Sequence, residues 1–193
     1  MQYRLDKESL LEHLSQWNTF LKRKVRLIAC GGTAMTLLGV KASTRDVDLM
    51  VPVIKEYEYL LRTLQALGYK SKSGWGWGRD DEPYVFDLFR GKSIHTTELL
   101  EDPLKEGNHV PIKKWTRIEL GVLNDYDLIV SKLFRGTQVD FDDCLALAAA
   151  HQGGVDLKKL KEHFFELLNF HTVGEERVRG NWDIFERRLK GVK

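Results

Sequence analysis

The sequence predicts an α/β or α+β fold in which a mixed β-sheet is followed by a helical lobe. Three observations predict it. Short hydrophobic runs typical of strands alternate with helical patterns over the first part of the chain. A glycine pair, Gly31-Gly32, ends one such run, and an Asp-x-Asp pair, Asp46 and Asp48, heads the next. Helical patterns then follow one another, so we expect a core over residues 1–123 and a helical lobe over residues 124–193.

Length and composition are those of a globular protein. The chain has 193 residues, of which 42% are hydrophobic, and its net charge is +2, so disorder is not expected and bulk charge does not indicate a nucleic-acid partner. Cys30 and Cys144 lie far apart in hydrophobic runs, which favours buried, reduced thiols. The N-terminal residues lack the apolar core of a signal peptide, and no apolar run reaches the ~20 residues of a membrane helix. We therefore expect a cytoplasmic protein without a membrane partner.

Periodicity and capping residues predict the elements of the core. Leucines and Trp17 recur at helical spacing after Asp6, which can cap that helix. In the third predicted helix, Ile54, Tyr57, Leu61 and Leu64 are expected to face inward. The expected helices cover residues 7–22, 33–38 and 54–67. The expected strands cover residues 25–30, 46–53, 69–72, 84–89 and 117–122, and residues 95–114 are expected to be irregular.

The helical lobe is predicted from polar residues that can cap apolar helices. Asn124, Asp140 and Asp156 each stand at the expected start of a helix. The expected helices cover residues 124–133, 141–150, a segment after residue 156, and residues 175–193. The last of these carries both basic and acidic side chains, so we interpret it as a solvated helix.

The Gly31-Gly32-Thr33 segment indicates a phosphate-binding turn. Glycines allow backbone N–H groups to approach a phosphate closely, and the start of the helix that follows favours an anion. Thr33 can contact a phosphate or cap the helix, and the two roles are compatible.

Asp46 and Asp48 indicate a site for a divalent cation. Alternation along a strand places both carboxylates on one face, where they repel each other unless a cation lies between them. Asp87 is the only charged residue in the run from Tyr84 to Phe89, and we expect it to be the third ligand. Three carboxylates can hold two Mg²⁺ ions about 3.5–4 Å apart, one activating a hydroxyl and one holding nucleotide phosphates.

A loop with alternating glycine and tryptophan, over residues 74–81, is expected between the strands at residues 69–72 and 84–89. Trp75 and Trp77 can stack on the bases of a nucleotide or RNA, or they can cover a sheet edge or a corner of the core. Arg79 can bind a phosphate or pair with Asp80 or Asp81.

Taken together, Gly31-Gly32-Thr33, Asp46-x-Asp48 and Asp87 resemble the nucleotidyltransferase superfamily with the DNA polymerase β-like fold. A closer resemblance, to the bacterial branch allied to abortive-infection (type IV) toxins, lies in the later motif. The residues that carry it are Asp127-Leu128-Ile129, Lys132-Leu133, Gly136, Asp140 and Asp143. Thr137 and Val139 stand where that branch often has basic residues.

The resemblance implies transfer of a nucleoside monophosphate from an NTP to a hydroxyl acceptor, with Mg²⁺ or Mn²⁺ as cofactor. Asp46, Asp48 and Asp87 would be the catalytic and metal-binding residues, and Gly31, Gly32, Thr33 and Lys132 would bind the nucleotide. The acceptor could be a tRNA, a protein or a small molecule, and an antitoxin is a possible partner. The alternative is a non-catalytic nucleotide- or RNA-binding module on the same fold.

Overall fold

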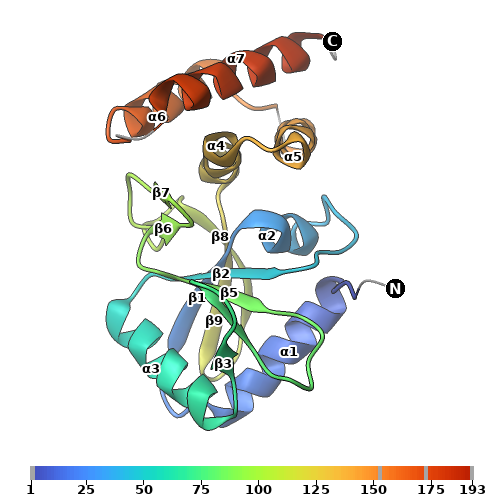
Figure 1. Cartoon of the computed structure of the whole chain (residues 1–193), viewed down its shortest axis with the longest axis vertical. Coiled ribbons are helices and arrows are strands. Elements are labelled where there is room, and N and C mark those ends of the chain that lie inside the picture. The colour runs from blue at the N-terminus through green and yellow to red at the C-terminus, as the bar shows by residue number, and fades with distance from the viewer. Residues whose placement is uncertain (1–2, 152–153, 172–173, 192–193) are drawn as a thin grey trace. The chain divides into compact units, whose positions relative to one another are not determined.

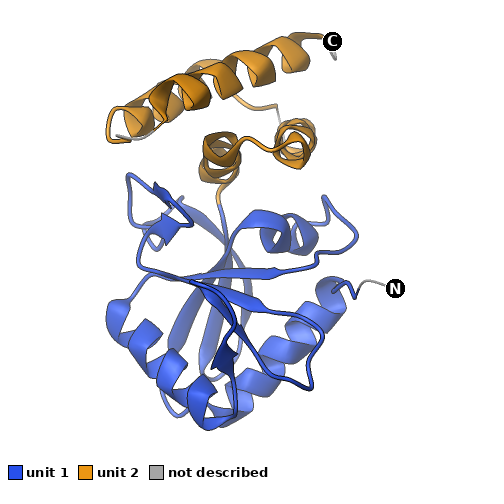
Figure 2. Ribbon diagram, in the orientation of Figure 1, with its two compact units in different colours: residues 1–123 blue, residues 124–193 orange. Residues whose placement is uncertain are grey.

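The computed structural model describes residues 3–151, 154–171 and 174–191. The chain forms two compact units, Met1–Leu123 and Asn124–Lys193 (Figure 2). The first contains the β-sheets and the second contains only helices among its described residues (Figure 1). The predicted fold class, a mixed sheet with a helical lobe after it, is confirmed.

Unit 1 is built on a seven-stranded mixed sheet with the order β3-β4-β5-β2-β1-β9-β8. β1 pairs antiparallel with β2 and parallel with β9, and β2 pairs parallel with β5. The strands are β1 (Val25–Ala29), β2 (Val47–Val51), β3 (Lys70–Ser71), β4 (Gly76–Gly78), β5 (Phe86–Arg90), β8 (His109–Lys114) and β9 (Ile118–Leu123). A separate hairpin consists of β6 (Ser93–Ile94) and β7 (Thr97–Glu98).

Two helices cover one face of this sheet, and a third lies on the other. α1 (Lys7–Phe20) and α3 (Ile54–Ala66) are on one side of the sheet, and α2 (Gly31–Leu37) is on the opposite side (Figure 1). The buried Trp17 of α1 packs on Phe86 of β5, with the ring centroids 4.4 Å apart. Because side chains alternate along β5, the next residue, Asp87, points to the face that α1 does not cover.

Several expected boundaries and elements of unit 1 were wrong. β2 begins at Val47, so Asp46 precedes the strand. α2 begins at Gly31 rather than at Thr33. The Gly-Trp segment contains β4, and the segment expected to be irregular, residues 95–114, contains β7 and β8. These short or exposed strands are formed by pairing with distant partners, which local periodicity does not reveal.

The inward face of α3 differs in part from the expected one. Leu64 is buried as expected, but the other buried residue of this helix is Leu60, and Ile54 at its first position is 38% exposed. By contrast, the cap expected for α1 is confirmed, because the Asp6 carboxylate accepts a hydrogen bond from the Ser9 N–H.

Unit 2 is a group of helices around an aromatic core. It contains α4 (Asp125–Arg135), α5 (Gln138–Ala150), α6 (Leu157–Leu168) and α7 (Glu175–Gly191). Phe164 of α6 packs against Trp182 of α7, with centroids 5.1 Å apart, and both side chains are buried. Burying such large apolar surfaces is what holds a small helical unit together.

Two of the three caps expected in unit 2 are confirmed. Asn124 caps α4, and Asp156 caps α6. The expected cap of α5 was wrong: Thr137 is the N-cap, and Asp140 is the third helical residue that completes a capping box with it. Among the described residues, no helix is long and apolar enough to cross a membrane.

Candidate active site

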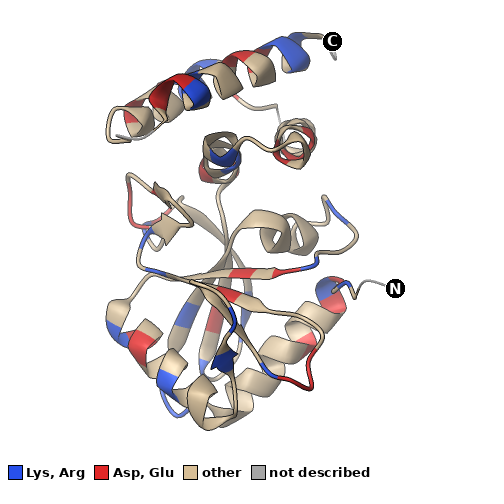
Figure 3. Cartoon of the chain, viewed as in Figure 1, with Lys and Arg blue, Asp and Glu red and all other residues tan. Residues whose placement is uncertain are grey.

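The backbone pairing of unit 1 brings the predicted site residues into a row across the sheet. Asp48 of β2 is the register partner of Asp87 of β5, and Asp87 is in turn the partner of Gly76 of β4. On the other side of Asp48, its carbonyl accepts a hydrogen bond from the N–H of Cys30, 3.1 Å away, at the end of β1. Adjacent strands are about 4.8 Å apart, so the two carboxylates and the Gly31-Gly32 turn are neighbours. Figure 3 shows the acidic segments of β2 and β5.

The turn after β1 requires glycine because of Asp48. Gly31 has a φ of +56°, and a Cβ added to it would collide with the Asp48 carboxylate. The N–H of Gly32 donates to Asp48 Oδ2 at 3.2 Å. The glycine pair therefore lets the backbone lie directly against the carboxylate, which a residue with a side chain would prevent.

Thr33 fixes the backbone that carries the Asp-x-Asp pair. Its hydroxyl donates to the carbonyl of Asp46 at 3.1 Å and accepts from the N–H of Asp48 at 2.8 Å. The side chain is buried, and Cys30 is the N-cap of α2. The predicted capping role of Thr33 was therefore wrong. A hydroxyl has a single proton to donate, and Thr33 already donates it to the carbonyl of Asp46. A phosphate contact by Thr33 stays a prediction.

Asp87 lies in an environment that disfavours its charge. Burial, followed by the nearby Asp48 carboxylate and more weakly Asp46, raises the pKa of Asp87 to about 6, while His95 acts in the opposite direction. A half-buried carboxyl with a pKa near neutrality can hold or accept a proton at physiological pH, as a general base does.

Asp46 is exposed and lies just before β2. Among the described residues, no group of three or more His, Cys, Asp and Glu side chains is already arranged to hold a metal. Like charges repel when no cation lies between them. The carboxylates of Asp48 and Asp46 nevertheless lie close enough to Asp87 to raise its pKa. Carboxylate oxygens are the ligands that Mg²⁺ prefers, so this donor set fits the expected cation.

An aromatic cluster borders Asp87. The ring of His95 packs on Phe89, two residues after Asp87 on β5, and on Trp75, which precedes β4. Trp75 is 40% exposed, whereas Phe89 is buried. Trp77, the register partner of Phe86, belongs to the opposite face. Sequence reasoning singled out Trp75 but missed His95, because a lone histidine in an irregular segment carries no pattern.

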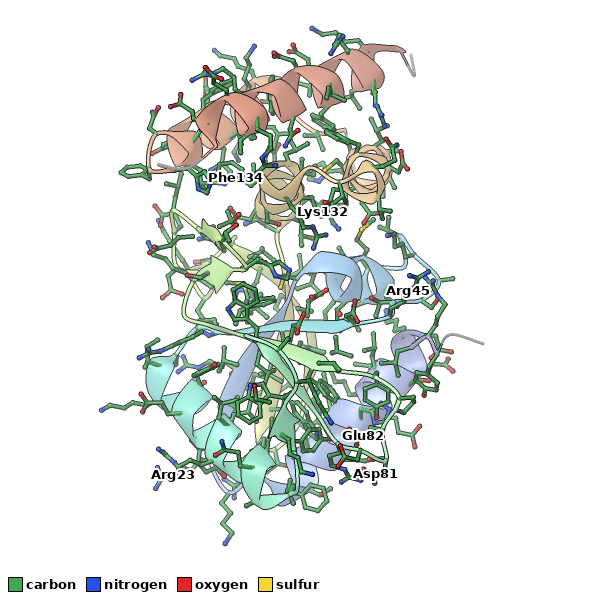
Figure 4. The ribbon with its side chains drawn as sticks, viewed as in Figure 1. Arg23, Arg45, Asp81, Glu82, Lys132 and Phe134 are labelled. Atoms are coloured by element: carbon green, nitrogen blue, oxygen red, sulfur yellow. The ribbon has the colours of Figure 1, made fainter. Side chains whose placement is uncertain are left out.

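Lys132 lies in unit 2, on α4, where Figure 4 labels it. Its side chain is 3% exposed, and its ammonium is 2.8 Å from Asp143 Oδ2 and 3.9 Å from Asp140 Oδ1. Asp140 also pairs with Arg135. The toxin-like motif thus forms a buried ion-pair network, and the nucleotide role of Lys132 stays a prediction. Arg79, the other basic candidate, pairs with Asp81.

A cavity of about 460 Å³ opens elsewhere in unit 1, between β1, β8, β9 and the loop before β8. Two of its cations are already paired, Arg26 with Glu56 and Lys114 with Glu119. None of the residues predicted for the site lines it.

The comparison with protein families decides the identity. Residues 8–190 match the family described as "Nucleotidyltransferase of unknown function (DUF6036)". The chain belongs to this family. It is therefore a nucleotidyltransferase, the enzyme class that transfers a nucleotide, and the superfamily indicated by Gly31-Gly32, Asp46 and Asp48 is confirmed. No curated protein matches the chain.

Solved structures with some likeness to this nucleotidyltransferase include one described as a putative nucleotidyltransferase and one described as nucleotidyltransferase-like. One from Thermotoga maritima has 15% identity and a TM-score of 0.49, covering 74% of this chain and 94% of its own. A nucleotidyltransferase-like protein from Paracoccidioides brasiliensis has 12% identity and a TM-score of 0.49, covering 92% and 95%. ANT(2")-Ia in complex with adenylyl-2"-tobramycin has 15% identity and a TM-score of 0.42, covering 94% and 95%. Such distant matches say nothing of this chain's substrate.

The raised pKa of Asp87 predicts a pH dependence of stability. Asp87 binds a proton more tightly in the folded state than in the unfolded state, where its pKa is near 3.8. Without metal, the contribution of Asp87 to the free energy of unfolding therefore falls as pH rises from about 4 to about 6. Asp87→Asn should remove that fall and be the more stable protein above pH 6. Urea unfolding in EDTA across pH 4–8 measures this. Parallel curves for wild type and Asp87→Asn would contradict it.

The buried network predicts that Lys132→Met destabilises the protein by about 3–5 kcal/mol, because it removes the cation that lies 2.8 Å from the buried Asp143 carboxylate. The double variant Lys132→Met/Asp143→Leu should recover much of that loss. Lys158→Met, at an exposed position of α6, is the control. Urea unfolding followed by circular dichroism is the measurement, and a Lys132→Met curve that matches the control would refute the prediction.

Proposed function

We propose that this nucleotidyltransferase transfers a nucleoside monophosphate from an NTP to a hydroxyl acceptor and releases pyrophosphate, with a divalent cation as cofactor. The observation that supports the proposal best is the row of Gly31-Gly32, Asp48 and Asp87 on neighbouring strands. In this row the Gly31-Gly32 turn, which has no side chains, lies beside two carboxylates. One bound triphosphate can therefore contact all of them.

In the proposed site, Asp46, Asp48 and Asp87 hold Mg²⁺ or Mn²⁺. The cation, when bound, neutralises phosphate charge and lowers the pKa of a coordinated hydroxyl. The Gly31-Gly32 turn holds the β- and γ-phosphates, because its backbone can approach them as closely as it approaches the Asp48 carboxylate. The rest of the catalysis is positioning and electrostatic stabilisation.

Asp87 is the residue proposed to receive the proton of the acceptor hydroxyl. As the acceptor oxygen forms its bond to the α-phosphorus, the bond from that phosphorus to the pyrophosphate oxygen breaks, and the hydroxyl proton passes to the Asp87 carboxylate. In the metal-free protein the pKa of Asp87 is about 6, so its carboxylate is mostly ionised at neutral pH and is a better base than an ordinary aspartate. A cation bound to Asp87 would lower that pKa.

Thermal shift tests the nucleotide half of the site. An NTP at about 100 times its Kd, with Mg²⁺, should stabilise the wild type by ~2.7 kcal/mol, which raises Tm by about 5–10 °C for a protein of this size. Asp46→Asn/Asp48→Asn should lose that shift. Glu12→Gln, on the exposed side of α1 and therefore beyond the opposite face of the sheet, should keep it.

Absence of a shift with every NTP, or an equal shift in Asp46→Asn/Asp48→Asn, would contradict the proposed site. A metal-dependent shift without pyrophosphate release in the presence of tRNA, protein and small-molecule acceptors would favour the non-catalytic binding module instead. The roles of Lys132 and of an antitoxin stay predictions.

A further inference from the structure

His95 has a backbone conformation, with a positive φ, that other residue types adopt more readily. The pairing of Ile94 with Thr97 leaves His95 and Thr96 as a two-residue loop between β6 and β7. His95 has a φ of +51° and is the one non-glycine with a positive φ among the described residues. Two-residue hairpin loops usually place glycine, asparagine or aspartate at their first position. A strained non-glycine residue held by its surroundings points to a use for its side chain.

The imidazole is held by aromatic rings beside Asp87. Its centroid lies 4.7 Å from that of Phe89 and 5.3 Å from that of Trp75, and its plane is 84° from the indole plane. It is also close enough to Asp87 to influence that carboxylate. Trp75 and His95 thus present two ring surfaces at right angles next to the carboxylate pair, and the indole remains 40% exposed.

The order of the strands indicates on which side of the carboxylate pair Trp75 and His95 lie. The phosphate turn lies on the β1 side of Asp48, whereas Asp87, Trp75 and Gly76 lie on the side of β5 and β4. In phosphoryl transfer the attacking and leaving oxygens are roughly in line. If pyrophosphate leaves toward Gly31-Gly32, the acceptor approaches from the side of Trp75.

We propose that Trp75 and His95 form the acceptor subsite and that the acceptor carries a nucleobase beside its hydroxyl. The proposal rests on the proposed function, which supplies the direction of attack. An exposed indole is a stacking surface for a base, and the perpendicular imidazole borders that surface. An open-chain hydroxyl compound would use neither surface.

Adenosine is the probe, and glycerol is the matched hydroxyl compound without a ring. Binding is followed by saturation-transfer NMR in the presence of Mg²⁺ and a saturating non-hydrolysable NTP analogue. The analogue is that of the NTP with the largest thermal shift, and it fills the site for the base of the NTP itself. Wild type should bind adenosine and not glycerol. Trp75→Ala should weaken adenosine binding about tenfold, the usual effect of losing one stacking partner. Trp77→Phe, on the other face of the sheet, should leave it unchanged.

His95→Gly separates the subsite from a purely structural role. Glycine tolerates the positive φ, so this variant should keep the circular dichroism spectrum of the wild type while it binds adenosine more weakly, because the imidazole beside Trp75 is gone. Equal adenosine binding in Trp75→Ala and wild type, displacement of adenosine by the analogue, or no adenosine binding at all would overturn the proposal. Failure of the proposed function is detected by a different experiment, as the absence of any thermal shift with Mg²⁺ and an NTP. In that case adenosine binding is measured without the analogue.

Discussion

The structure of the site depends on one constraint, the register that holds Asp48 opposite Asp87 on parallel strands. Two carboxylates at this spacing repel each other, and burial adds to the effect on Asp87. The fold tolerates this unfavourable pair because the rest of unit 1 is well packed, with an apolar layer between the sheet and α1. A cation between the carboxylates would be attracted to both and would remove their repulsion, which favours its binding.

The turn after β1 is adapted to the same pair. Gly31 has no side chain because the Asp48 carboxylate occupies the space, and Thr33 uses both its donor and an acceptor lone pair to fix the backbone around Asp46 and Asp48. Unit 2 contains a second buried arrangement of charge, in which Lys132 is neutralised by Asp143. The motif that resembles toxin nucleotidyltransferases is thus, in this structure, the interior of a helical unit.

Local patterns predict some of this and miss the rest for physical reasons. Side-chain alternation predicts that Asp87 and Phe86 face opposite ways, and polar residues before apolar runs predict the caps of α1, α4 and α6. The pairing of β5 with β2 is a contact between distant segments, which periodicity cannot reveal. The same holds for the hydrogen bonds of Thr33 to the β2 segment and for the salt bridge between Lys132 and Asp143 on the next helix. His95 owes its place to a strained loop between two-residue strands, which sequence patterns did not predict.

Direct measurement of cation binding is the most decisive experiment. Mn²⁺ can be titrated into the metal-free protein and the free ion followed by electron paramagnetic resonance, in wild type, Asp48→Asn and the Glu12→Gln control. We predict saturable binding of one or two Mn²⁺ ions in wild type and in Glu12→Gln, and at least tenfold weaker binding in Asp48→Asn, because one of the facing carboxylates has lost its charge. Equal Mn²⁺ affinity in wild type and Asp48→Asn would show that the carboxylates on β2 and β5 do not form a metal site.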